Sequence, residues 1–401
     1  MKAFISALLA LLLLSGCNGS DEKLAFKAEN IHNDILTVDT HCDTPMRLAE
    51  ADFDLGVKHD DGCVDFPRMV EGGLDAEFFA VYIAQGPRND SAYSYVHKKA
   101  VEIFEAIHRN VVKNSSMAEL AYSPVDAYRL KKKKKIAVFI GVENGYVICN
   151  NPARIKEFYD LGTRYITLCH TGNNDICDSS VDPKGPEHDG LSAFGREVVK
   201  EMNRLGIMID VSHISDEAFF DVISSSQAPV IASHSSARAL CSSPRNLSDE
   251  MLLSLKSNGG VVQICIFSRY IKTPEHSPEL DAKLKELSVR YGDISSLPDE
   301  KRQSYDNERK DIKDTYTKLA TVADVVDHID HVVQVIGIDH VGIGTDFDGG
   351  GEVEGCRSVA EMKNITIELL RRGYTKADIE KIWGGNTMRV FREVEKTAAG
   401  I

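Results

Sequence analysis

The sequence predicts an α/β fold, and within that class a TIM-like (β/α)₈ barrel, from three observations. Hydrophobic runs of strand length recur about eight times, helical patterns lie between them, and most runs are almost continuously apolar. Continuous apolar runs are typical of parallel strands that are buried on both faces. Repeated strand–helix units indicate either a barrel or a doubly wound sheet. We favour the barrel because no G-x-G-x-x-G turn follows the first strand.

The predicted elements alternate from residue 35 to the end of the chain. The expected strands are 35–43, 76–83, 136–143, 165–170, 206–213, 229–234, 260–267 and 340–346. The clearest helical patterns are 95–112, 152–159, 192–205, 216–224, 249–257, 321–336 and 359–371, and a last amphipathic helix is expected at 375–396. Residues 274–318 are rich in charge and predict a helical insertion within a single domain spanning 31–401.

The N-terminus predicts export and lipid anchoring. Lys2 precedes an apolar run over 4–14 that fits a signal peptide and is too short to span a bilayer. The Leu-Ser-Gly-Cys that ends at Cys17 resembles a bacterial lipobox, so residues 1–16 are expected to be a lipoprotein signal peptide. Cys17 would carry the lipid and 17–30 would be a tether to the membrane. We expect the bacterial cell envelope as location, at its periplasmic or outer-membrane face; an ordinary secretory signal is the alternative.

Composition narrows the function classes. The chain has 401 residues, of which 43% are hydrophobic and 27% charged, which is enough for one large core. The formal net charge of -14 argues against nucleic acid as a partner, because phosphates attract basic surfaces. Besides Cys17, the cysteines leave buried thiols and disulfides both open.

Polar residues gather where the predicted strands end. They are His41, Asp43, Glu143, His170, His213, His234 and Asp346. In a barrel every parallel strand delivers its carboxyl end to the same face, so these side chains are expected to meet. Imidazole and carboxylate ligands suit zinc and similar divalent ions. The sequence therefore predicts a metal centre at this face.

The spacing of the candidate ligands favours two ions. His41 and Asp43 are two residues apart on a strand and share one face, so Cys42 turns away from them. A carboxylate such as Glu143 can bridge two ions, and His213 and His234 can complete a second site. Paired metals activate a water molecule for hydrolysis. No G-x-S-x-G or H-E-x-x-H motif points to another hydrolytic site.

The motifs VDTHCD, GVENG, ITLCH, IDVSH, SHSSAR, PRN, GTDFDG and WGGN follow one another between residues 35 and 393. With them the chain resembles the membrane (renal-type) dipeptidases, zinc peptidases with an amidohydrolase-type barrel. The resemblance implies two Zn²⁺ per subunit. It implies that His41 and Asp43 hold one ion, that His213 and His234 hold the other, and that Glu143 bridges them.

The resemblance also implies the roles of three further residues. His170 would bind substrate and stabilise the tetrahedral intermediate, Arg245 would bind the free carboxylate of the substrate, and Asp346 would be the acid/base group. The implied reaction is attack of a dizinc-bridging hydroxide on the peptide bond of a dipeptide, with a C-terminal D-residue tolerated. Dipeptides are thus the expected partners, and a homodimer is a candidate assembly.

One departure and two alternatives stay open. Relatives often have a tyrosine on the seventh strand that assists carboxylate binding; this chain has Gln263 to Phe267 there, which leaves Tyr270 as a candidate replacement. Another metal-dependent amidohydrolase, acting on an N-acyl amino acid or a β-lactam, would need the same ligands. A solute-binding lipoprotein is the other alternative, and the complete ligand set argues against it.

Overall fold

The chain forms a nearly closed barrel of parallel strands, as the sequence predicts. The computed structural model describes residues 22–49, 53–275, 277–292, 294 and 297–400. Neighbouring strands follow the order β1-β2-β4-β5-β6-β7-β8-β9. Their bounds are β1 Val38–Cys42, β2 Ala76–Tyr82, β4 Ile136–Glu143, β5 Thr163–Thr167, β6 Met208–Asp210, β7 Ile231–Ser235, β8 Val261–Ile264 and β9 Val341–Ile343.

Hydrogen bonds just beyond the strand ends join β9 to β1 and close the barrel. The Asp346 N–H donates to the carbonyl oxygen of His41 at 3.1 Å. The buried carboxylate of Asp39 accepts from the Thr345 N–H at 2.8 Å and from the Thr345 hydroxyl at 2.6 Å. Closure therefore fixes the two strand ends that carry His41 and Asp346.

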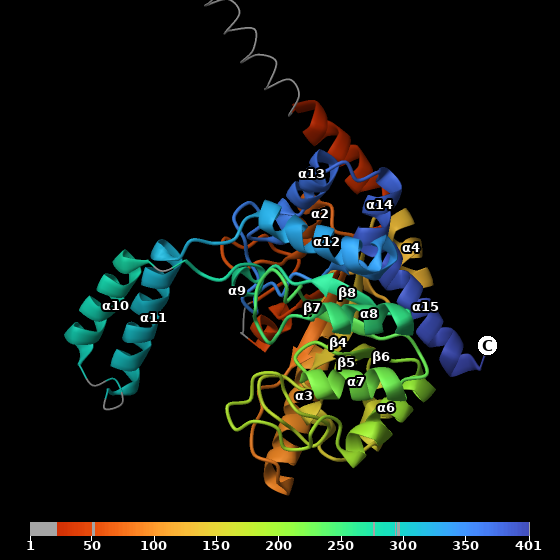
Figure 1. The fold of residues 1–401 in the computed structure, drawn as a ribbon, viewed down its shortest axis with the longest axis horizontal. Helices are drawn as coiled ribbons and strands as arrows, with labels where there is room; N and C mark the ends of the chain where they lie inside the picture. The colour runs from red at the N-terminus through yellow and green to blue at the C-terminus, as the bar shows by residue number, and fades with distance from the viewer. Residues whose placement is uncertain (1–21, 50–52, 276, 293, 295–296, 401) are drawn as a thin grey trace, which may run out of the picture.

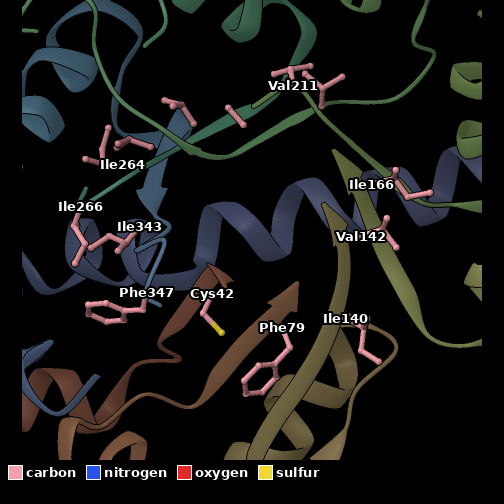
Figure 2. Close-up of a cluster of buried hydrophobic side chains, with 14 of the residues drawn as sticks. Cys42, Phe79, Ile140, Val142, Ile166, Val211, Ile264, Ile266, Ile343 and Phe347 are labelled. Carbon is pink, nitrogen blue, oxygen red and sulfur yellow. The ribbon is translucent and has the colours of Figure 1, made fainter. Parts of the chain in front are cut away.

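Apolar side chains pack on both faces of the strands. The larger cluster, between the strands and the surrounding helices, includes Cys42, Phe79 and Ile140 (Figure 2). A second cluster fills the inner face, where the rings of Phe78 and Phe139 stack with centroids 4.6 Å apart. Burial on both faces explains why the strands are almost continuously apolar in sequence.

Helices cover the outside of the barrel (Figure 1). Those at predicted helical segments are α3 (Asp90–Lys113), α5 (Ala153–Asp160), α6 (Ala193–Leu205), α7 (Asp216–Ser225), α8 (Asp249–Asn258), α12 (Val322–Ile336) and α13 (Lys363–Arg371). Shorter ones are α2 (Phe66–Gly72), α4 (Pro124–Lys132) and α9 (Ser268–Ile271). Within the described ranges, no helix has the length and apolar character needed to cross a bilayer.

The predicted N-terminal features are described only in part. The signal peptide at 1–16 and Cys17 lie outside the described residues. Residues 22–34, which overlap the predicted tether, form a helix. Ala28 and Ile31 of this helix join the outer apolar cluster, so the helix packs onto the barrel domain.

The charged segment 274–318 contains two helices, α10 (Pro278–Tyr291) and α11 (Asp299–Tyr316), which we call the arm. The arm projects from the barrel as a helical hairpin (Figure 1). Within it, the rings of Tyr291 and Tyr305 lie 5.4 Å apart, and the Tyr291 hydroxyl donates to Glu308 at 2.6 Å.

The homodimer named above as a candidate assembly stays a prediction.

The structure differs from the prediction in an added strand and in the last helix. A short strand, β3 (Ala118–Leu120), pairs with the first half of β4. The predicted helix at 375–396 is divided into α14 (Lys376–Glu380), a π-helical turn (Lys381–Gly385) and α15 (Asn386–Ala399). The turn passes close to the barrel: a Cβ at Gly384 would lie 2.7 Å from the carbonyl oxygen of Leu36.

Candidate active site

The polar residues that the sequence places at strand ends meet at one face of the barrel. Three groups have their candidate ligand atoms within 4.8 Å of one another: His41, Glu143 and His234; Glu143, His170 and His213; and His41, Asp43 and Asp346. β5 ends at Thr167, so the predicted strand at 165–170 was too long and His170 lies in the loop that follows. Its side chain still reaches the cluster.

Glu143, the last residue of β4, lies at the centre of the cluster. Its Oε1 is 3.1 Å from Nε2 of His213 and 3.5 Å from Nε2 of His234. Its Oε2 is 3.5 Å from Nε2 of His41. The Nε2 atoms of His213 and His234 are themselves 2.8 Å apart. One carboxylate thus presents its two oxygens to two ligand groups, which is the arrangement of a bridging ligand.

Buried polar atoms without a hydrogen-bond partner show that these residues fit a cation. Nε2 of His41 lies 3.7 Å from Oδ2 of Asp43. His41 Nε2 and Asp43 Oδ1 are buried and have no hydrogen-bond partner among the described residues. Burying such atoms unpaired is unfavourable. Imidazole nitrogens and carboxylate oxygens in this arrangement could hold one or two divalent ions.

Burial sets the protonation of two histidines. It lowers the pKa of His213 well below the usual value, and the charge of Arg245 adds to this effect. Burial lowers the pKa of His234 to about 3, with a contribution from the charge of His41. Both rings are therefore neutral near pH 7 and can offer a nitrogen lone pair to a metal.

The two acids Glu143 and Asp346 behave in opposite ways. Burial alone would raise the pKa of Glu143, but the charge of His41 and hydrogen bonds with facing imidazoles hold this pKa well below its usual range. Burial raises the pKa of Asp346 well above its usual value, and the nearby charge of Asp43 raises it further. Glu143 is therefore a carboxylate, whereas Asp346 binds a proton more readily.

Arg245 lies inside the site and not in a surface ion pair. It is only 4% exposed, and its Nη2 donates to the carbonyl oxygen of His234 at 3.1 Å. Its guanidinium carbon lies 5.3 Å from the ring centroid of Tyr270, the candidate replacement for the seventh-strand tyrosine. Its buried Nε has no partner in the described part of the chain. A guanidinium with a spare donor suits a carboxylate.

Comparison with known proteins gives the family. The model of the membrane dipeptidase family, peptidase family M19, matches residues 26–401. The chain belongs to this family. Its membership confirms the barrel and makes the protein a hydrolase, a metallo-dipeptidase whose substrates are dipeptides.

Individual relatives agree with the family assignment. Dipeptidase tcpJ of Claviceps purpurea is 36% identical over 344 residues, which are 84% of this chain and 71% of tcpJ. Dipeptidase 3 of Mus musculus is 31% identical, over 94% of this chain and 68% of the mouse protein. The crystal structure of the probable dipeptidase PvdM from Pseudomonas aeruginosa has a TM-score of 0.83 and 32% identity, over 94% of this chain and all of PvdM.

Groups behind the imidazoles orient the site of this dipeptidase. The Tyr165 hydroxyl is 2.7 Å from Nδ1 of His41. Ser233 Oγ is 2.8 Å from Nδ1 of His234 and donates to Asp210 at 2.6 Å. Metal-binding histidines usually have such a partner on their second nitrogen. Ser233 is fully buried and lies behind the ring, so it positions His234 and is not a nucleophile.

Sequence reasoning missed these orienting residues. In the sequence Tyr165 looks like an ordinary core residue. A Cβ at Gly141 would lie 2.1 Å from the Tyr165 ring, but the sequence around Gly141 gives no sign of this close contact. Tyr82, whose hydroxyl is 3.3 Å from Nδ1 of His170, ends an apolar strand. Only Asp210 gave a usable signal, because an acid inside the apolar run IMIDV needs a buried partner.

Cys42 turns away from the ligands, as its position between His41 and Asp43 predicts. It is fully buried in the outer apolar cluster. Figure 2 shows its sulfur among the side chains of that cluster, which include Phe79 and Phe347. Its thiol therefore contributes to packing and lies outside the candidate ligand groups.

The loop after β9 brings a glycine against two acids of the site. Asp346 has φ of 62°, and its carbonyl oxygen accepts from the Gly351 N–H at 2.7 Å, so the loop turns sharply here. A Cβ on Gly349 would lie 2.1 Å from Asp43 Oδ2 and 2.4 Å from Asp346 Oδ1. Residue 349 must therefore lack a side chain for both acids to keep their places.

Gly349→Ala is expected to lower kcat/KM by about 10²-fold, because displacing catalytic groups by ~1 Å has an effect of that size. Steady-state kinetics on a cleaved dipeptide, with circular dichroism to monitor folding, measures it. Gly86→Ala is a matched control, since its Cβ would come no closer than 3.2 Å, to the Tyr146 hydroxyl. Wild-type kinetics for Gly349→Ala would contradict the packing argument.

Proposed function

We propose that the enzyme hydrolyses the peptide bond of dipeptides with two Zn²⁺ ions, one held by His41 and Asp43 and the other by His213 and His234. Glu143 would be shared between them. The observation that carries the proposal is the position of Glu143, whose two oxygens face different histidine groups. Nitrogen and oxygen donors of this kind suit Zn²⁺. Bound ions would polarise the peptide carbonyl and lower the pKa of a water molecule towards neutrality.

Proton transfer is assigned to Asp346. It is buried beside His41 and Asp43, and burial with the charge of Asp43 raises its pKa well above the usual value. A carboxyl group of this kind can take a proton from the attacking water and deliver it to the departing amine nitrogen. No covalent intermediate with the protein is needed.

His170 is assigned to the developing negative charge on the carbonyl oxygen. Its Nε2 lies 3.8 Å from Oε1 of Glu143, and burial lowers its pKa, so the ring is neutral. When the Tyr82 hydroxyl donates to Nδ1 at 3.3 Å, Nε2 carries the proton. That N–H can then stabilise the oxyanion in a water-poor site.

Arg245 is assigned to the free carboxylate next to the scissile bond. A longer peptide would place an amide there and leave a buried guanidinium without its ion partner, which is strongly unfavourable. The 4% exposure of Arg245 supports this assignment, because no solvent can replace the missing carboxylate. The proposal includes tolerance of a D-residue at this position, which the family resemblance implies.

The test is release of free amino acids from matched L-L and L-D dipeptides, from the corresponding tripeptides and from N-acetyl amino acids. We expect the zinc-loaded protein to cleave dipeptides of both kinds and to leave tripeptides intact. A chelator should abolish turnover, and added Zn²⁺ should restore it. Cleavage of N-acyl amino acids without cleavage of any dipeptide would overturn the proposal in favour of another amidohydrolase activity.

The proposal also places the enzyme in the bacterial cell envelope through a lipid on Cys17. Cys17→Ser is expected to move the protein from the membrane fraction to the soluble fraction, because it removes the acceptor for the lipid while leaving the barrel unchanged. Fractionation followed by immunoblotting measures this. Cys63→Ser, a change in the barrel domain, is the control and should remain with the membranes. Retention of Cys17→Ser in the membrane fraction would refute the anchor.

A further inference from the structure

A cavity of about 950 Å³ opens beside the metal ligand Asp43. Its walls come from the loops after β1, β8 and β9 and from the C-terminal end of α11 in the arm. This volume lies at the upper end of the roughly 300–1000 Å³ of small-molecule sites. The cavity therefore has room for a large substrate side chain next to the ligand groups.

Several of the charged residues on the cavity wall form ion pairs. Arg47 pairs with Asp61 at 3.0 Å, and Lys272 pairs with Asp324 at 3.1 Å. Lys318 lies 3.8 Å from Glu275. These contacts neutralise part of the wall.

Arg269 of α9 and Lys313 of α11 differ from these pairs. Both line the cavity, and within the described ranges neither side chain forms an ion pair, which is also true of Arg357. Partial burial lowers the pKa of Lys313, and the positive charges of Arg309 and Arg269 lower it further. Two cations of one cavity lining thus interact unfavourably, in a chain with formal net charge -14. Like charges destabilise each other unless an anion lies between them.

We propose that Arg269 and Lys313 form a subsite for a side-chain carboxylate of the substrate, so that the enzyme prefers dipeptides containing Glu or Asp. This rests on the proposed dipeptidase function. A side-chain carboxylate is the only anion that an unmodified dipeptide offers besides its C-terminus, which Arg245 binds. Asp60 and Glu352 also line the cavity, so the preference arises locally at the two cations and not from the cavity as a whole.

The arm gains a role from this subsite. Lys313 belongs to the arm, whereas Arg269 belongs to the barrel, so the cation pair exists only where the arm meets the barrel. The charged insertion therefore selects substrates through its base and not through its projecting tip.

The experiment compares kcat/KM for isosteric pairs, Glu-Ala with Gln-Ala and Ala-Glu with Ala-Gln, using the zinc-loaded full-length protein. For at least one pair the Glu form should be preferred by roughly fivefold or more, the effect of about 1 kcal/mol from partly exposed ion pairs. In the Arg269→Gln/Lys313→Gln double variant this ratio should fall to about one. The ratio of kcat/KM values is the quantity to compare, because a general loss of activity lowers both values and leaves their ratio unchanged.

Lys301→Gln is the matched control, since Lys301 is an exposed residue of the same helix outside the cavity lining. It should keep the wild-type ratio. Raising the ionic strength should reduce the ratio in wild type but not in the double variant. Equal rates for Glu and Gln substrates in wild type, or a ratio that persists in the double variant, would overturn the subsite while the dipeptidase function stands. Absence of hydrolysis for every dipeptide would overturn both.

Discussion

Asp346→Asn is expected to lower kcat by about 10²–10⁴-fold, the usual contribution of a general acid/base, while the metal content stays at the wild-type level. Asparagine keeps the size of the side chain but can neither accept the proton of the attacking water nor pass it to the amine. Stopped or continuous assays of dipeptide cleavage give kcat, and elemental analysis of the same preparation gives the metal content.

The metal measurement decides between two roles for Asp346. Its carboxylate belongs to the group of candidate ligand atoms formed with His41 and Asp43. If Asp346→Asn loses an ion together with activity, Asp346 is a ligand and the acid/base assignment is wrong. Asp348→Asn is a suitable control, because Asp348 lies in the same loop but accepts hydrogen bonds from Thr44 and from the Cys63 N–H.

Glu143→Gln is expected to remove both ions and to abolish activity. A glutamine of the same shape carries no negative charge and turns an N–H₂ group towards one of the two histidine groups, so neither ion keeps its carboxylate ligand. Metal affinity should fall by more than the roughly 10–100-fold that loss of a group behind a ligand causes. Metal-to-protein stoichiometry after gel filtration, with a competing chelator, measures the change.

Asp43→Asn provides the contrast for Glu143→Gln. Asp43 lies near His41, at 3.7 Å, whereas Glu143 reaches His41, His213 and His234. Asp43→Asn should therefore weaken the binding of one ion and leave the other ion bound. Equal losses from the two variants, or two retained ions in Glu143→Gln, would show that Glu143 is not shared between the ions.

The ligand cluster could be predicted from the sequence because strand ends are marked by two simple signals. Apolar runs end at His41, Glu143 and His234, and the parallel arrangement brings such ends to one face. The period of two along a strand also predicted that Cys42 faces away from its neighbours. These inferences needed only local patterns and one rule of topology.

The rest of the site depends on contacts between residues far apart in the chain. Tyr165 is 124 positions from His41, and nothing in its own segment shows that its hydroxyl reaches that ring. The burial of Arg245 follows from the neighbouring His234 and Tyr270, not from the PRN motif. The break in the predicted helix at 375–396 likewise reflects a close approach to Leu36, which periodicity within the helix cannot reveal.

The closure of the barrel has a consequence for the stage of folding at which the active site is assembled. Asp39 and Thr345 are 306 positions apart, and Asp346 follows immediately. Contacts of such sequence separation form late, because the loop between them loses much conformational entropy. A chain cut before β9 would contain every histidine of the centre but neither Asp346 nor the partner of Asp39. On the proposed role of Asp346, a chain that ends before β9 would therefore lack dipeptidase activity even though it contains all the histidines of the site.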